Sequence, residues 1–290
     1  MSFDEIQAPR QWRCVDFISD LHLQESEPAT FLAWRGYLER TPADAIFILG
    51  DLFELWVGDD VLSGPVDANL IARHEGLHFE DRCTRVLHFA AQQKAIYFLH
   101  GNRDFLIGEH FLASSGVQLL SDPSVLIFGE QRYLLSHGDA LCLSDDDYQQ
   151  FRIKVRGSEW QQSFLATPLQ ERLQQARQMR TQSEARKQSQ QAAQQPFSDV
   201  DAAVAVQWMD ATRSSHFIHG HTHEGVDHPL ESAQGVGVRH VLPDWHATGR
   251  QPRGHALRLS LDTRMSDESA GDVDLVKTKV QTVVQRVSTV

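Results

Sequence analysis

The chain has 290 residues, a formal net charge of −12, 41% hydrophobic residues and 23% charged residues. This composition is typical of a soluble globular protein with one large domain, or with one domain and a lid. The negative field repels nucleic acid and polyphosphates, so we expect no nucleic-acid partner, and a phosphate substrate would need local cations. The three cysteines, Cys14, Cys83 and Cys142, indicate neither a disulfide framework nor a zinc knuckle.

The amino-terminal residues and the apolar runs argue against a secreted or membrane-spanning protein. Asp4 and Glu5 stand where a signal peptide would be basic, and no apolar core follows them. No apolar run approaches the roughly 20 residues that a membrane-spanning helix needs. We therefore expect a cytoplasmic protein, which could still lie against a membrane surface.

Short, almost continuously apolar runs predict strands that are covered on both faces. They span residues 14–18, 45–49, 95–99, 133–135 and 217–218, followed later by 239–242 and 256–261. Between the early runs, residues 31–40 and 83–91 repeat apolar side chains at helical spacing. The alternation of strand and helix predicts an α/β layered core in a domain spanning residues 11–262.

Two regions depart from this alternation. Residues 151–197 are rich in Gln, Arg and Ala, and they predict a helical lid insertion over the core. Its apolar side chains fall at helical spacing, and they are Trp160, Phe164, Leu165, Leu169 and Leu173. Pro168 suits the start of a second helix. The tail, residues 263–290, carries valines that suit either a terminal helix or a disordered extension.

Each of the first five apolar runs is followed by side chains that can bind metal ions. In chain order these are Asp20 and His22, then Asp51, Asn102 and His137, and finally His221 and His223. In open α/β sheets, ligands bind at the carboxyl ends of the strands. Residues about 200 positions apart are therefore expected to meet in one site.

The residue types narrow the chemistry of this predicted site. Asp, Asn and His without Cys suit manganese, iron, zinc or cobalt ions. Seven ligands are too many for one ion with an open position but suit two ions, with Asp51 as the best candidate for a bridge. Two ions about 3.5–4 Å apart clamp the attacking and leaving oxygens of a phosphoryl transfer and acidify a bound water. The nucleophile would then be a metal-bound hydroxide. Taken singly, each motif also suits a turn, a helix cap or a buried histidine.

In this order, the motifs resemble those of the calcineurin-like metallophosphoesterases. The resemblance implies a β-sandwich of two sheets flanked by helices. It also implies that one metal ion is held by Asp20, His22, Asp51 and His223. The other ion would be held by Asp51, Asn102, His137 and His221.

A closer resemblance rests on Arg103, where most of that superfamily has His, and on the run from Asp51 to Asp60. Both are similar to the UDP-2,3-diacylglucosamine hydrolase family of lipid A biosynthesis. That resemblance implies manganese-dependent hydrolysis of the pyrophosphate bond of a diacylated UDP-sugar. The products would be UMP and 2,3-diacylglucosamine 1-phosphate (lipid X). It also implies a peripheral location on the inner face of the cell inner membrane.

Further residues are assigned to the substrate by position within that resemblance. They are Asn102, Arg103, Asp145, Ser183 and His221, together with Lys187 and Gln190, where the family usually has Asn and then Lys. Arg103 suits a phosphate because a guanidinium binds its oxygens bidentately, although it could instead pair with Asp59 or Asp60. The basic residues Arg172, Arg177 and Arg180 could face anionic lipid headgroups. The insertion could equally be a helical hairpin that only packs on the core.

Two other functions are compatible with the same residues. One is a two-metal phosphoesterase that acts on a soluble dinucleotide or phosphodiester. The other is a catalytically inactive scaffold, which the full set of seven competent ligands argues against. The sequence leaves the native metal, the acyl-chain length and the oligomeric state open.

Overall fold

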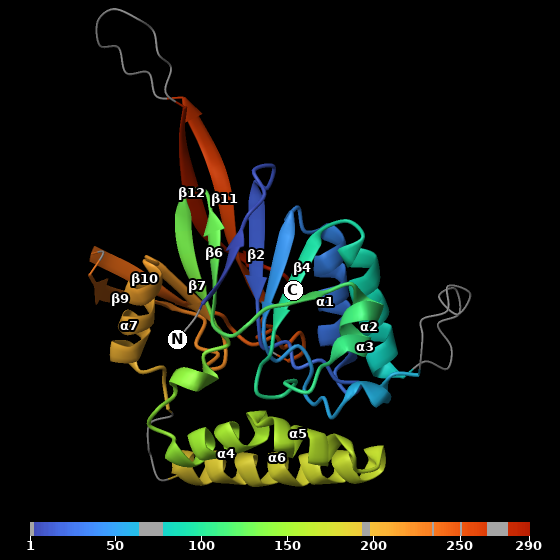
Figure 1. The fold of residues 1–290 in the computed structure, drawn as a ribbon. Helices are drawn as coiled ribbons and strands as arrows, with labels where there is room; N and C mark the ends of the chain where they lie inside the picture. Colours follow the sequence, from blue (N-terminus) through green and yellow to red (C-terminus); the bar gives the residue numbers. More distant parts are fainter. Residues whose placement is uncertain (1–2, 64–77, 193–197, 234, 250, 266–277) are drawn as a thin grey trace, which may run out of the picture.

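A computed structural model describes residues 3–63, 78–192, 198–233, 235–249, 251–265 and 278–290. For residues 182–192, 263–265 and 278–280 it describes the backbone alone. Two sheets face each other and helices cover their outer sides, as predicted (Figure 1).

One sheet has six described strands in the order β1-β6-β7-β8-β10-β9. They are β1 (Asp4–Gln7), β6 (Ser124–Phe128), β7 (Gln131–Leu135), β8 (His216–His219), β10 (Gly235–Val241) and β9 (Asp227–Ser232). The other sheet has the order β12-β11-β2-β3-β4-β5. It contains β12 (Thr278–Ser288), β11 (His255–Met265), β2 (Cys14–Ile18), β3 (Ala45–Leu49), β4 (Ala95–Leu99) and β5 (Gln118–Leu119).

The helices form separate layers around this sandwich (Figure 1). On the side of β2 to β4 lie α1 (Pro28–Arg40), α2 (Phe79–Ala91) and α3 (Glu109–Ser115). The opposite side carries α7 (Ala202–Thr212). Across one end of the sandwich run α4 (Asp146–Arg156), α5 (Ser158–Leu165) and α6 (Leu169–Ala192). There are also two short 3-10 turns. The turn η1 (Asp59–Val61) lies between β3 and α2, and the turn η2 (Asp139–Leu141) lies between β7 and α4.

The central strands are apolar throughout because both of their faces are buried. On β3, Phe47 and Leu49 point into the core between the two sheets, whereas Ile46 and Ile48 belong to the core beneath the helices. All four side chains are 0% exposed. Burial of each stabilises the fold by about 1.5–3 kcal/mol relative to an exposed side chain. The prediction that such strands are covered on both faces is confirmed for β3.

The predicted elements differ from the observed ones mainly at their ends. The strands at residues 14–18, 45–49 and 95–99 are confirmed to the residue. Helix α1 begins at Pro28, earlier than its apolar repeat, because a proline suits the first helical position. The strands β1, β5, β6 and β9 and the helices α3 and α7 were not predicted, and β6 and α7 contribute buried residues to the cores.

The tail corrects one prediction. Thr278–Ser288 is a strand that pairs antiparallel with β11, from His255–Ser288 to Met265–Thr278. For these residues both expected alternatives, a terminal helix and a disordered extension, were wrong. The pairing with β11 supplies the backbone hydrogen bonds of this strand. Its apolar residue Val284 packs against the core between the sheets, and the next residue, Gln285, is exposed. Residues 266–277 of the tail lie outside the described residues.

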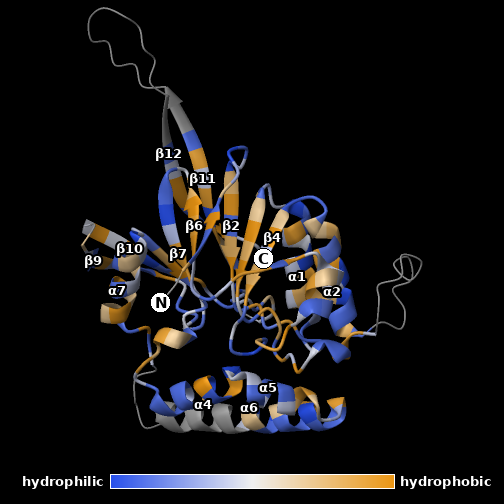
Figure 2. Ribbon diagram, viewed as in Figure 1, coloured by the Kyte–Doolittle hydropathy of each residue, from blue (hydrophilic) through white to orange (hydrophobic). Residues whose placement is uncertain are grey.

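The helical insertion packs on the core through its apolar stripe. Phe164 is buried, and Trp160, Leu169 and Leu173 pack against the core beneath the helices. Along the described parts of α4 to α6, hydrophilic residues predominate between the apolar ones (Figure 2). Arg172 corrects a prediction, because it is 2% exposed and cannot face a lipid headgroup. Among the described residues, none of the helices combines the length and apolar character that crossing a bilayer requires.

Candidate metal centre

The seven predicted metal ligands meet at one end of the sandwich. The strands β2, β3 and β4 run parallel to one another, and so do β7 and β8. Each strand therefore delivers the loop after its last residue to the same edge of its sheet. The sequence motifs lie in these loops, and the contacts between their side chains connect both sheets.

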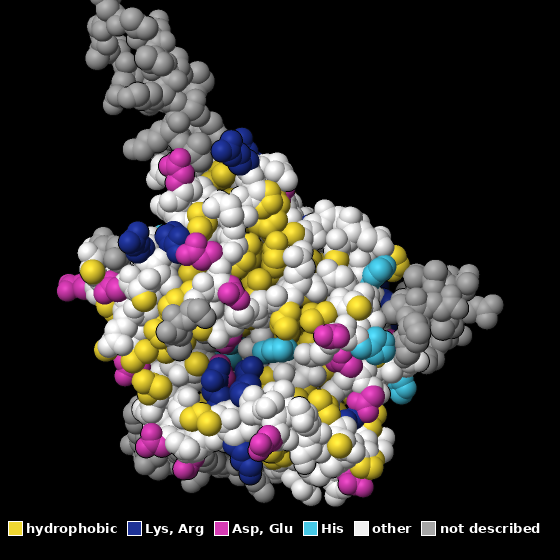
Figure 3. Space-filling model, in the orientation of Figure 1, with side chains coloured by type: hydrophobic (Ala, Val, Ile, Leu, Met, Phe, Trp, Pro, Cys, Tyr) yellow, Lys and Arg dark blue, Asp and Glu magenta, His cyan; other side chains and the backbone are white. Residues whose placement is uncertain are grey.

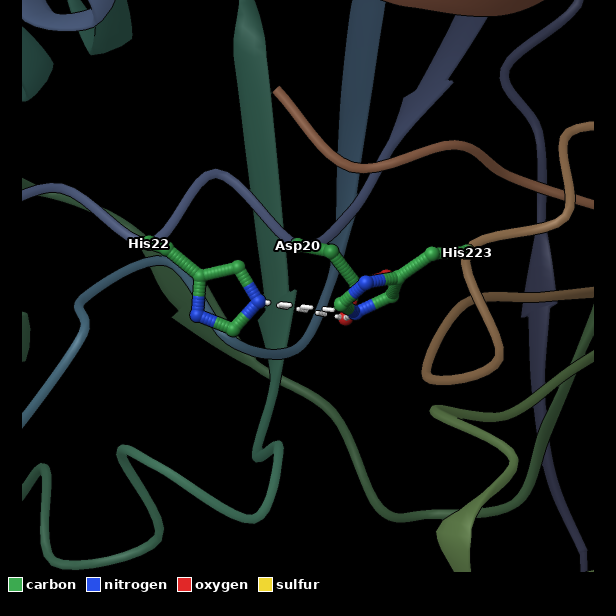
Figure 4. A group of neighbouring side chains, drawn as sticks. All are labelled: Asp20, His22 and His223. Carbon is green, nitrogen blue, oxygen red and sulfur yellow. Dashed lines mark hydrogen bonds and ion pairs between the residues drawn. The ribbon is translucent and has the colours of Figure 1, made fainter. Parts of the chain in front are cut away.

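Asp20, His22 and His223 form the first group of side chains (Figure 4). His223 Nε2 lies 3.1 Å from Asp20 Oδ1 and 3.5 Å from His22 Nε2. Asp51 closes this group, because its Oδ2 lies 4.0 Å from His22 Nε2. Two carboxylates and two imidazoles thus present ligand atoms to a common centre.

The second group shares Asp51 with the first. His137 Nε2 lies 3.7 Å from Asp51 Oδ1 and 3.0 Å from Asn102 Oδ1. His221 Nδ1 lies 2.9 Å from the same Asn102 oxygen. The two oxygens of Asp51 therefore face different groups, which is the arrangement expected of a carboxylate between two ions.

Backbone strain is concentrated at these ligands. In the described chain, seven non-glycine residues have positive φ, and five of them are candidate ligands. These are Asp20 (54°), His22 (47°), Asp51 (50°), His221 (65°) and His223 (60°). Such left-handed conformations cost of order 1–3 kcal/mol each and persist where the surroundings impose them, often at functional sites. The loops are shaped for side-chain convergence and not for the most stable backbone.

The close approach of two loops explains one glycine of the motifs. A Cβ on Gly101 would lie 2.1 Å from Asp51 Oδ1 and 2.3 Å from the Asp51 backbone nitrogen. Any larger residue would therefore push the Asn102 loop away from Asp51. The neighbouring Arg103 N–H donates to Asp51 Oδ1 at 2.8 Å, which fixes the carboxylate against this loop.

Asp104 connects the same two loops through hydrogen bonds to their backbones. Its side chain is 0% exposed and accepts hydrogen bonds from the backbone N–H groups of Leu52 at 2.6 Å and Gly101 at 2.9 Å. Burial and the charge of Asp51 raise the pKa of Asp104 to about 7. Asp104 therefore supports the site through the backbone of these loops and not through a ligand side chain.

Two histidine ligands are oriented through their second nitrogen. His137 Nδ1 donates to the Leu49 carbonyl at 2.9 Å, and His22 Nδ1 lies 2.9 Å from Glu54 Oε2. Both contacts leave Nε2 free to face the site, as is usual for metal-bound imidazoles. Burial alone would lower the pKa of His137, but the carboxylates of Asp51 and Asp20 outweigh it and raise the pKa to about 9. The pocket therefore attracts positive charge.

Asp139 connects the metal site with the helical insertion. It accepts a hydrogen bond from the Tyr148 hydroxyl at 2.6 Å and from Arg152 Nε at 2.8 Å, both on α4. The Tyr148 ring stacks on His221 with centroids 5.9 Å apart. Burial opposes ionisation of Asp139, but His137, Arg152 and Arg156 hold its pKa below the usual value. Asp139 thus reaches His221 through a tyrosine.

Some contacts of the site were not predicted as such. Glu54 is 7% exposed, and it contacts His22 on one oxygen and Arg180 of α6 on the other. Burial opposes its ionisation, but His22, Arg103 and Arg180 outweigh this effect and lower the pKa of Glu54. The sequence pointed to Glu54 only through its place in the run after Asp51. Its contacts with His22 and Arg180 join segments that are distant in sequence and meet only on folding.

The predicted substrate residues are only partly placed by the structure. Arg103 lines a cavity beside His22 and His223. Neither alternative partner of Arg103 is engaged with it, because Asp60 pairs with Arg172, and Asp59 accepts from Trp56 Nε1 and from backbone N–H groups. Asp145 accepts from the Tyr148 N–H at 3.1 Å as the N-cap of α4. The side chains of Ser183, Lys187 and Gln190 lie outside the described ones.

A two-sheet sandwich with Asp, Asn and His ligands at its strand ends is the structure of a metallophosphoesterase. The chain matches the Calcineurin-like phosphoesterase family over residues 15–225 and belongs to that family. Membership makes it a metal-dependent hydrolase that uses divalent ions. Within this class, the sequence relatives place the chain among the UDP-2,3-diacylglucosamine hydrolases.

Relatives with that name match most of this chain. The protein of Chromobacterium violaceum is 43% identical over 239 residues, which cover 80% of this chain and 90% of the relative. The protein of Chromohalobacter salexigens is 40% identical over 84% of this chain and 92% of the relative. The protein of Serratia proteamaculans is 41% identical over 80% of this chain and 91% of the relative.

Proposed function

We propose that this chain hydrolyses the pyrophosphate bond of UDP-2,3-diacylglucosamine, releasing UMP and 2,3-diacylglucosamine 1-phosphate for lipid A biosynthesis. The observation that carries the proposal is the pair of ligand groups that share Asp51, in a chain 43% identical to a hydrolase of that name. The soluble-dinucleotide alternative has no comparable support.

The donor set fits two divalent ions. One ion would be held by Asp20, His22, Asp51 and His223, and the other by Asp51, Asn102, His137 and His221. Oxygen and imidazole donors without thiolates suit manganese, which we propose as the native metal. When bound, the ions supply an activated water and stabilise the negative charge that develops on the phosphoryl oxygens.

Arg103 adds a positively charged side chain to the metal site. Its carbonyl accepts from the Trp56 N–H at 3.1 Å, and its backbone N–H donates to Asp51, so the residue is fixed between two loops of the metal centre. Its Nε is buried and has no hydrogen-bond partner among the described residues. A guanidinium in this place binds phosphate oxygens bidentately and stays charged throughout turnover. We assign it to the pyrophosphate.

The helical insertion is suited to a lipid substrate at a membrane surface. On α4, Phe151 is 40% exposed and Ile153 is 65% exposed, and Leu165 at the end of α5 is 41% exposed. Arg177 of α6 is exposed as well. An insertion that exposes both apolar side chains and a cation is suited to the surface of an anionic bilayer. We propose that the protein lies on the inner face of the cell inner membrane, where its substrate resides.

The test is manganese-dependent release of UMP from UDP-2,3-diacylglucosamine by the purified chain. A soluble dinucleotide and a simple phosphodiester serve as competing substrates under the same conditions. We expect the highest kcat/KM for the diacylated UDP-sugar. Faster turnover of either soluble compound would reject the lipid assignment while leaving the metal-dependent hydrolase in place.

A further inference from the structure

A polar cavity of about 250 Å³ opens beside the metal ligands His22 and His223. Its other lining residues come from loops distant in sequence, and they include Gln24, Glu27, Arg103, Asp244, Trp245 and His246. The loop with Asp244 and Trp245 is fixed to the metal centre, because the Trp245 N–H donates to the Asp20 carbonyl at 3.0 Å. Basic and histidine side chains also gather at the hollow between the sandwich and the insertion (Figure 3).

The size and lining of this cavity select a small polar ligand. Its volume is below the roughly 300–1,000 Å³ of pockets for drug-sized ligands, which are mostly apolar. Two acyl chains would therefore find neither the room nor the apolar walls they need. A nucleoside monophosphate has the opposite character, with an anionic end and several hydroxyl and amide groups.

The Glu27 carboxylate does not cap the helix at whose start it lies. It stands at the N-cap of α1, yet its side chain makes no capping hydrogen bond, and Ser, Thr, Asp and Asn are the usual caps. The one hydrogen bond of the Glu27 carboxylate among the described residues comes from Thr248 Oγ1 at 3.5 Å. The other acidic side chains of the cavity are Asp244 and Glu54, and both are paired. Asp244 pairs with Arg253 at 2.7 Å, and Glu54 contacts His22 and Arg180.

The charges of the lining match the groups of a nucleotide. Arg103 and the metal ligands suit a phosphoryl group, whereas a carboxylate would repel it. Carboxylates instead accept hydrogen bonds from ribose hydroxyls, as acidic residues do in dinucleotide-binding sites. Glu27 is therefore suited to the sugar of a nucleotide whose phosphate lies at the metal centre.

We propose that this cavity binds the uridine monophosphate half of the substrate, with Glu27 accepting hydrogen bonds from the ribose hydroxyls. The inference rests on the proposed function and extends it, because it assigns the leaving nucleotide to one side of the metal centre. The diacylated half is then left to the region of the helical insertion.

The test measures binding of UMP and of 2′,3′-dideoxy-UMP to the manganese-loaded full chain by titration calorimetry. The wild type should bind UMP about tenfold to a hundredfold more tightly, the range expected for hydrogen bonds to a charged group. Glu27→Ala should bind the two nucleotides equally, with affinity for the dideoxy compound unchanged. Glu25→Ala is the matched control, because Glu25 is an exposed carboxylate two residues away that does not line the cavity.

Either of two results would overturn the inference. One is a Glu27→Ala protein that keeps the wild-type preference for UMP, and the other is a wild type with no preference. Inhibition by 2,3-diacylglucosamine 1-phosphate should be unaffected by Glu27→Ala, and its loss would place the lipid half in the cavity. Failure of the proposed function is a separate outcome, since the wild type would then release no UMP from the diacylated UDP-sugar even if it binds UMP.

Discussion

Replacing Glu54 by Ala should weaken one of the two metal sites and spare the other. Glu54 Oε2 lies 2.9 Å from His22 Nδ1, and the two side chains are 9% and 17% exposed, so solvent screens this contact little. His22 belongs only to the group with Asp20 and His223. Loss of a carboxylate behind a ligating histidine typically costs about 10–100-fold in metal affinity or activity. That factor corresponds to about 1.4–2.8 kcal/mol.

The assay is calorimetric titration of metal-free protein with Mn²⁺. We expect one of two binding affinities to fall by about 10–100-fold in Glu54→Ala and the other to stay constant. Glu54→Gln should have a smaller effect, because its amide oxygen can still accept the hydrogen bond from Nδ1. Glu39→Ala is the control, since the side chain of Glu39 pairs with Arg35 at an exposed position of α1. Two unchanged affinities, or two that fall equally, would refute the assignment of His22 to one site.

Three further substitutions test other parts of the site and fold. Asp51→Ala should leave a folded protein with activity reduced about 100-fold or more and fewer bound ions by elemental analysis, because both groups lose a ligand; wild-type turnover would contradict the shared carboxylate. Arg103→Lys should lower kcat by about tenfold or more without changing metal content, since an ammonium cannot bind two phosphate oxygens in a fork. Burial lowers the pKa of His100 to about 4, so the unfolded chain binds more protons below pH 6.5 and stability falls as the pH drops toward 4. His100→Gln should reduce the dependence of the free energy of unfolding on pH by up to about 1.4 kcal/mol per pH unit. Urea unfolding at pH 7, 6 and 5 without metal measures this dependence. An unchanged dependence would show that His100 is not the group responsible.

The sequence predicted which loops meet, because that prediction depends on few assumptions. A covered strand is apolar at every position, so runs such as residues 45–49 mark their own ends. Parallel strands then bring those ends to one edge, and Asp51 meets residues of four other loops without any knowledge of loop conformation. The number of ligands favoured two ions, whereas the division of the ligands into two groups that share Asp51 was what the family resemblance implied.

The contacts behind the ligands could not be predicted in the same way. The sequence analysis allowed Arg172 and Arg180 to face lipid headgroups. The partner that each arginine binds depends on the direction of its long side chain on α6. The structure instead gives Arg172 to Asp60 and the Leu165 carbonyl, and Arg180 to Glu54. Helical periodicity places a residue on a face but does not say which acidic loop that face will meet.

The tail shows a different limit. Val280, Val283, Val284 and Val287 are compatible with a helical repeat, but Val284 and its neighbours also fit the alternation of a strand at one edge of a sheet. For a short run with both patterns, the outcome depends on whether an unpaired strand edge is within reach. The edge of β11 supplied that partner, from residue 255 to residue 265.

The metal centre combines two costs that the apolar core must offset. Five ligands hold left-handed backbone conformations, and Asp20 and Asp51 are 0% and 2% exposed within reach of the same histidines. Burial and the charge of Asp51 together raise the pKa of Asp104, because buried carboxylates lose their hydration and repel one another. Divalent ions held by these residues would offset this repulsion, and their coordination would offset the cost of the left-handed loop conformations. The fold therefore provides rigid positions for the side chains, and two divalent ions would supply the charge balance.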